Sequence, residues 1–407
     1  MSQIFRQFRG LRLPVRSLVF LFWIYSLTTS LTSVFIQLFL YQEFSSFALN
    51  VLATLIFDTG IAVTFCILGF FASRWQLNIK YGFFWSFILM GVTLLVLLKS
   101  DTPALAYLAM GVNGLGNGLF WLTIHTFELS ETRNEERDFY SSLLTAGTVI
   151  VAILGPALAT LLLWLSGQVF NIGQFTLLFI ITPLFYLFGF FCFSGLNNYR
   201  PTPIEWHDFS HFLTERKNRS AQPYLLATAW QEVVSTVTIP LVVLFLLGGV
   251  IQVGLYATSF AVFSALFILA LAQYRTVENR LKILGISTSF LAVSSALFAS
   301  LLSAPGVILY GFAGAVSWPV VRVSIHVTDL YTMESMGRSG KDFYATMIFR
   351  DASLWVWRML AGTLLISLTF FFTQEKNILS GGLYLYALGL LLVFLGASIL
   401  MRAMKRG

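Results

Sequence analysis

The stretch RDFYSS at residues 137–142 returns as KDFYAT at residues 341–346. The shared Asp-Phe-Tyr begins at Asp138 and again at Asp342, which lies 204 residues (342 minus 138) further along a chain of 407. A repeat spaced at half the length of a chain predicts two halves with the same fold, joined in parallel.

Further matches extend the repeat upstream of each copy. An Ile-His pair precedes each Asp-Phe-Tyr, and a carboxylate follows each histidine by three residues: Ile124, His125 and Glu128 in the first copy, Ile325, His326 and Asp329 in the second. A stretch rich in small residues comes before each pair, GVNGLGNG at 111–118 and GFAGAVSW at 311–318. The same helices are therefore predicted to recur in both halves, which is typical of transporters.

The composition is that of a membrane protein. Hydrophobic residues make up 57% of the chain and charged residues 11%, whereas soluble domains carry about 25% charged residues. The net charge of +7 does not indicate nucleic-acid binding, because the basic residues lie in short loops between apolar stretches. Cys66 and Cys192 both lie in apolar stretches, which argues against a disulfide framework or a thiolate metal site.

Twelve stretches are long and apolar enough to cross a bilayer, which takes about 20 residues. They are 17–40, 46–72, 81–99, 104–127, 139–165, 173–195, 222–247, 250–273, 283–303, 305–328, 343–372 and 379–401. We therefore predict an all-α integral membrane fold of twelve transmembrane helices in two pseudo-symmetric six-helix bundles, residues 1–195 and 222–407. The cytoplasmic linker between them, 196–221, is predicted to form a short amphipathic helix over 203–217.

The basic residues differ strongly between the two sides of the predicted membrane. With the N-terminus in the cytoplasm, twenty of the 25 Lys and Arg residues fall in inner segments, and only Lys99 and Lys376 fall in outer loops. The other three, Arg322, Arg350 and Arg358, lie within spans. Because cytoplasmic loops are enriched in basic residues, we predict that both termini face the cytoplasm.

The loop after the second predicted span carries a motif of a known family. It reads Gly69-Phe-Phe-Ala72-Ser73-Arg74-Trp75-Gln76-Leu77. Here the chain resembles the major facilitator superfamily, whose pattern is Gly-x-x-small-Asp-Arg-aromatic-Gly-Arg, although Ser73 replaces the Asp and the final Gly-Arg is absent. The resemblance covers essentially the whole chain. It implies a secondary transporter whose first, fourth, seventh and tenth helices line a central cavity, and whose second and eleventh helices meet.

Charged residues deep inside spans are expected to face a cavity or a partner, because a charge in lipid is costly. They are Asp58, Glu232, Arg322, Arg350, Asp351 and Arg358. The resemblance implies that Asp58 and Arg358 pair, and we predict proton coupling by these two with Asp351 and Glu232. A static ion pair that fixes packing is the alternative. Facing Arg322, Glu232 is also a candidate for holding substrate or a gate.

Polar and aromatic residues recur every four residues in the spans expected to line the cavity, which places them on one helix face. Such a face suits a small-molecule site of aromatic rings with a few polar groups. The predicted substrate-binding residues are Asn113, Asn117, Trp121, Gln231, Glu232, Trp318 and Arg322. The alternative is that these side chains bond neighbouring helices together.

Gating residues are predicted near the cytoplasmic ends of the spans. The two His-x-x-carboxylate pairs favour a pH-sensitive gate over a metal site, since metal-binding helix pairs carry the reverse order, Glu-x-x-His. Asp138 and Asp342 begin the fifth and eleventh spans, where a carboxylate caps free amides, and the resemblance implies that they also latch onto basic loops. The predicted gate residues are Arg74, His125, Asp138, His326, Asp342 and Arg350.

Together these features predict a secondary active transporter that moves a small organic or amphipathic solute across the cytoplasmic (inner) membrane by alternating access, coupled to protons. The sequence has no G-x-x-x-x-G-K-[ST] loop, so ATP hydrolysis is not expected. The alternatives are a flippase for a lipid-linked head group and a polytopic enzyme that uses the His-x-x-acid pairs. We expect the solute, protons and membrane lipids as partners, no nucleic acid, no metal or other cofactor, and a monomer.

Overall fold

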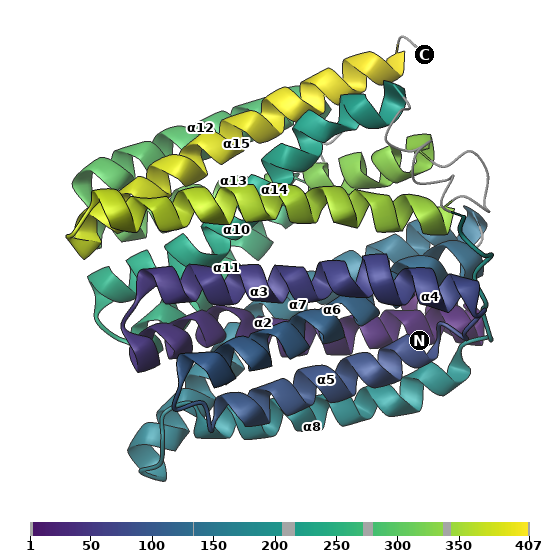
Figure 1. Ribbon diagram of the computed structural model, residues 1–407, viewed down its shortest axis with the longest axis horizontal. Helices are drawn as coiled ribbons and strands as arrows, with labels where there is room; N and C mark the ends of the chain where they lie inside the picture. Colours follow the sequence, from purple (N-terminus) through teal and green to yellow (C-terminus); the bar gives the residue numbers. More distant parts are fainter. Residues whose placement is uncertain (1–2, 133, 206–215, 272–279, 337–342, 406–407) are drawn as a thin grey trace. The chain divides into compact units, whose positions relative to one another are not determined.

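A computed structural model describes residues 3–132, 134–205, 216–271, 280–336 and 343–405 (Figure 1). Within these ranges the chain is helical and has no strand. The elements are α1 (Gln3–Gly10), α2 (Leu13–Phe44), α3 (Phe47–Val63), the π-helical turn η1 (Thr64–Leu68), α4 (Gly69–Arg74), α5 (Tyr81–Leu97), α6 (Pro103–Glu131), α7 (Asn134–Trp164), the π-helical turn η2 (Leu165–Val169), α8 (Thr176–Cys192), the 3-10 turn η3 (Phe193–Gly195), α10 (Arg216–Leu247), α11 (Val250–Leu271), α12 (Arg280–Leu301), α13 (Ala304–Met336), α14 (Phe343–Phe371) and α15 (Glu375–Lys405).

Ten helical segments in the described ranges are long and apolar enough to cross a membrane. The predicted span at 81–99 is the shorter apolar helix α5, with 17 residues. The predicted span at 104–127 is α6, which has 29 residues but contains glycines, asparagines and a histidine that lower its hydropathy. The prediction of an all-α membrane fold is confirmed for the described residues, whereas the exact arrangement of twelve helices in two bundles stays a prediction.

The chain divides into two compact units. Unit 1 comprises Met1–Ser33 and Thr59–Pro203, and unit 2 comprises Val34–Asp58 and Ile204–Gly407. The end of α2 and the start of α3 form a hairpin that belongs to unit 2, with the C-terminal helices. The predicted bundles place this hairpin in the N-terminal half, and their boundaries stay a prediction. Most of the predicted linker helix falls on residues 206–215, outside the described residues.

Unit 1 depends on close helix contacts at small residues. A Cβ atom on Gly60 would lie 2.5 Å from the carbonyl oxygen of Gly111 in α6, so glycine lets these two backbones touch. A Cβ atom on Gly116, also in α6, would lie 2.8 Å from Met90 of α5. In turn α5 lies beside α8 (Figure 1). The small-residue stretch 111–118 is therefore a packing surface toward two helices.

Unit 2 uses a similar device between α10 and α15, which lie side by side (Figure 1). Three glycines spaced seven residues apart on α15 face α10: Gly382 meets Thr238, Gly389 meets Trp230, and Gly396 meets the backbone of Tyr224. The indole N–H of Trp230 donates to the carbonyl oxygen of Leu385 at 2.9 Å. This contact fixes α10, the helix that carries Glu232.

Candidate functional site

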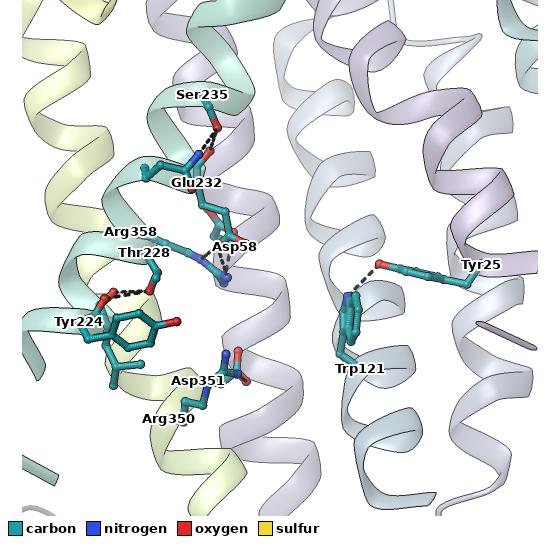
Figure 2. Close-up of polar contacts among 12 residues, drawn as sticks. Tyr25, Asp58, Trp121, Tyr224, Thr228, Glu232, Ser235, Arg350, Asp351 and Arg358 are labelled. Carbon is teal, nitrogen blue, oxygen red and sulfur yellow. Dashed lines mark hydrogen bonds and ion pairs between the residues drawn. The ribbon is translucent and has the colours of Figure 1, made fainter. Parts of the chain in front are cut away.

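A charge cluster in unit 2 is centred on Arg358 of α14. Its Nη1 lies 3.5 Å from Oδ1 of Asp58 in α3, and its Nη2 lies 2.7 Å from Oε2 of Glu232 in α10 (Figure 2). The side chains of Arg358 and Asp58 are 11% and 8% exposed, whereas that of Glu232 is 59% exposed. One guanidinium is therefore shared by a buried carboxylate and an exposed one. Glu232, which we expected opposite Arg322, bonds to Arg358.

Two further charges lie two turns away on α14. Arg350 Nη1 is 3.9 Å from Oδ2 of Asp351, and both side chains are largely buried. Asp351 also acts electrostatically on Asp58 and Arg358. Asp351 and Arg358 are seven residues apart and share a helix face. The cluster of Asp58, Glu232, Arg350, Asp351 and Arg358 thus carries three carboxylates and two guanidiniums.

A chain of neutral hydrogen bonds in unit 1 joins α2 to α6, and we call it the neutral stripe. Trp121 Nε1 donates to Tyr25 Oη at 2.8 Å (Figure 2). Tyr25 Oη donates in turn to Asn117 Oδ1 at 2.8 Å. Asn117 Nδ2 donates in turn to Asn113 Oδ1 at 3.1 Å. The Tyr25 ring also stacks on Phe120, with centroids 3.7 Å apart. The structure therefore brings the predicted α6 residues together through Tyr25, which sequence reasoning missed.

In unit 1, the His-x-x-carboxylate pair contacts the tyrosine of the first Asp-Phe-Tyr. His125 Nδ1 lies 3.2 Å from Glu128 Oε2, within α6. Tyr140 of α7, the tyrosine of the first Asp-Phe-Tyr, donates to Glu128 Oε1 at 3.0 Å. The tyrosine thus bonds the carboxylate that faces the histidine and links α7 to α6.

Comparison with known proteins identifies the family. The sequence profile described as Major Facilitator Superfamily matches residues 18–328, well over half of the chain. The chain belongs to the major facilitator superfamily. Among solved structures, the crystal structure of the human organic anion transporter MFSD10 (TETRAN) is similar, with a TM-score of 0.63 and 14% sequence identity over 95% of this chain and 99% of that one. No curated protein matches the sequence.

Members of the major facilitator superfamily are transporters, so this chain is an integral, multi-pass membrane transporter. At 14% identity the solved structure supports the fold alone. The prediction of the family is confirmed, and the prediction of a transporter is confirmed at that general level. The roles of individual residues stay predictions.

The superfamily motif, Gly69 to Leu77, comprises α4 and the turn that ends it. Gln76 has a φ angle of 49°, and its N–H bonds to the carbonyl of Ser73, while the N–H of Leu77 bonds to the carbonyl of Ala72. This pair of bonds is the Schellman ending, which favours glycine at the position of Gln76. The superfamily pattern has glycine at this position, which adopts a positive φ angle without steric strain. Gln76 adopts the same backbone conformation with a Cβ atom.

The remaining predicted residues have varied surroundings. Gln231 is buried and donates to Ser235 Oγ at 3.1 Å. Trp318 packs against a buried apolar cluster of unit 2, which favours a packing role.

Arg74 and Arg322 are exposed. Asp342 lies outside the described residues, as do the side chains of Asp138 and His326. In the described part of the chain, no three His, Cys, Asp or Glu residues gather as metal ligands would.

Proposed function

We propose that this chain is a secondary active transporter that moves a small organic or amphipathic solute by alternating access and is coupled to protons through the charge cluster. The observation that carries the proposal is the sharing of Arg358 between buried Asp58 and exposed Glu232. Ionisable residues inside membrane spans are costly and commonly mark proton or substrate pathways.

Protonation and solute binding oppose each other in this arrangement. Deprotonated Asp58 attracts Arg358 and thereby weakens the hold of Arg358 on Glu232. Glu232, which is 59% exposed, is then available to bind a donor group of the solute. A proton on Asp58 removes the competing charge, so Glu232 returns to Arg358. Solute affinity therefore depends on the protonation of Asp58, which is the requirement for coupled transport.

The neutral stripe supports a solute with an apolar or aromatic part. Trp121 is partly exposed, and its ring lies against His125 and Phe22, with centroids 5.2 and 6.5 Å away. Because the indole N–H is already bonded to Tyr25, the stripe offers ring surface more than donors.

Transport by the reconstituted protein tests this proposal. A thermal-shift screen against metabolites, lipids and drugs identifies a ligand, since binding to the native state raises apparent stability. In proteoliposomes, Asp58→Asn should abolish uptake of the labelled ligand driven by a pH gradient, because the neutral side chain leaves Arg358 to Glu232 at every pH. Asp101→Asn, in an exposed loop, is the matched control. Uptake by Asp58→Asn with an unaltered pH dependence would refute the coupling role.

The same screen separates the alternatives. Stabilisation by lipid-linked head groups only would favour the flippase. We propose cytoplasmic termini on the basis of the basic-residue asymmetry, and labelling of single cysteines in the terminal segments with a membrane-impermeant reagent tests that orientation.

A further inference from the structure

A buried polar cluster lies inside the hairpin of unit 2. Gln37 Nε2 of α2 donates to Thr54 Oγ1 of α3 at 3.1 Å. Asn50 Nδ2 donates to the carbonyl oxygen of Gln37 at 3.0 Å, and Thr54 Oγ1 donates to the carbonyl oxygen of Asn50 at 3.1 Å. Gln37, Asn50 and Thr54 are 3%, 1% and 4% exposed. Each of the two side-chain amide nitrogens donates a hydrogen bond within the hairpin.

Two amide oxygens of this cluster lack a donor. Gln37 Oε1 and Asn50 Oδ1 are fully buried, and neither has a hydrogen-bond partner among the described residues. Buried acceptors are nearly always paired, either with protein or with ordered water. Two unmatched acceptors call for a ligand that donates hydrogen bonds, and water is the common one in protein interiors.

The cluster continues toward the charge cluster. Asn50, Thr54 and Asp58 are four residues apart on α3, so they form one stripe with about 6 Å between successive side chains. Asn50 is the fourth residue of α3 (Phe47–Val63), close to the turn of the hairpin. With the N-terminus in the cytoplasm this turn faces the outer side. The charges around Asp58 at the far end of the stripe are Glu232 of α10, and Asp351 and Arg358 of α14.

We propose that Gln37, Asn50 and Thr54 hold water that conducts protons between the outer surface and Asp58. Polar side chains one helical turn apart, with about 6 Å between their Cβ atoms, are close enough for a water to bridge them. A hydronium ion at the outer surface gives a proton to the first water, each step breaks one O–H bond and forms another, and the carboxylate of Asp58 receives the last proton. This route rests on the proposed role of Asp58 in coupling and adds the path by which protons arrive.

The test measures proton uptake from each side separately. The full-length protein is reconstituted in one orientation with a trapped pH dye, and an acid pulse is applied outside or inside. We expect Asn50→Leu and Gln37→Leu to slow Asp58-dependent uptake from the outer side on the order of tenfold, a small part of what a lost proton-transfer group can cost, and to leave uptake from the cytoplasmic side unchanged. Asn50→Ser, which keeps a polar group, should retain most of the rate.

Thr54→Val, the third hairpin variant, should also slow proton uptake from the outer side. Thr288→Val is its matched control. Thr288 is also buried in unit 2, and its hydroxyl bonds only to carbonyls of its own helix, so its loss should not affect proton uptake. If all hairpin variants behave like Thr288→Val while Asp58→Asn abolishes uptake, the route is wrong and the coupling role stands. If Asp58→Asn leaves uptake intact, the proposed function itself fails. Equal slowing from both sides, or a sodium dependence that the variants remove, overturns the water route.

Discussion

The neutral stripe of unit 1 and the charge cluster of unit 2 satisfy polar groups inside apolar helices in different ways. Both place polar groups inside helices that are expected to cross the membrane. In unit 1, Tyr25, Asn117 and Trp121 pair donors with acceptors and carry no charge. In unit 2, Asp58, Glu232 and Arg358 pair opposite charges. One unit therefore satisfies its buried polar groups with neutral hydrogen bonds and the other with ion pairs.

The difference predicts different responses to substitution. A neutral hydrogen bond contributes about 1 kcal/mol and does not change with pH. A buried ion pair depends on both partners, because removing one leaves an uncompensated charge. Unit 2 should therefore be sensitive to single substitutions and tolerant of paired ones, whereas unit 1 should lose stability in small independent steps.

Arg358→Gln should have the largest effect. The change leaves the buried carboxylate of Asp58 without the guanidinium that pairs with it. It should lower the free energy of unfolding by about 3–5 kcal/mol and abolish transport. The double variant Asp58→Asn with Arg358→Gln should recover most of that stability and still lack proton-coupled uptake. Thermal unfolding and proteoliposome uptake measure the two properties. A double variant as unstable as the single one would show that Asp58 and Arg358 do not act as a pair.

Tyr25→Phe should have an intermediate effect. The change removes the acceptor of Trp121 and the donor to Asn117, and the buried groups left behind cost about 1–3 kcal/mol. We expect weaker solute binding in a thermal-shift titration and an unchanged pH dependence of uptake. Tyr256→Phe, which removes a single bond to the carbonyl of Val307, is the matched control. A shift of the pH profile by Tyr25→Phe would show that the neutral stripe takes part in coupling.

Tyr140→Phe should have a smaller effect, since it removes one hydrogen bond to Glu128. We expect a loss of about 0.5–1.5 kcal/mol, with transport retained. Tyr81→Phe, at an exposed tyrosine of α5, should change neither property. If Tyr140→Phe instead abolishes transport while the protein keeps its full stability, the contact of His125 with Glu128 is part of a gate. Unit 1 would then also contain a functional ionisable pair.

The sequence predicted the helical membrane fold and the family because hydropathy, basic asymmetry and the repeat are each carried by many residues at once. It also placed Asn113, Asn117 and Trp121 on one face, since helical spacing is regular. It missed Tyr25 and the unit 2 placement of the hairpin at Val34–Asp58. The contacts of Tyr25 and of the hairpin depend on tertiary packing. The spacing of residues along a single helix does not reveal such contacts. The bond from Arg358 to Glu232 was not foreseen for the same reason, because helix spacing orders residues along one helix and not between two.

Gln76→Gly should have the smallest effect, and in the stabilising direction. Gln76 holds a φ angle of 49° at the end of α4, where a residue with a Cβ costs about 1–2 kcal/mol. Glycine removes that strain but gains freedom in the unfolded chain, which offsets about 0.5–1 kcal/mol. We therefore expect a rise in the free energy of unfolding of up to about 1 kcal/mol, with uptake and its pH dependence unchanged. Gln76→Asn should gain part of this, since asparagine tolerates the left-handed region, whereas Gln76→Ala should gain nothing. A gain from alanine equal to that from glycine would mean that the glutamine side chain, and not the backbone, limits stability at this turn of unit 1.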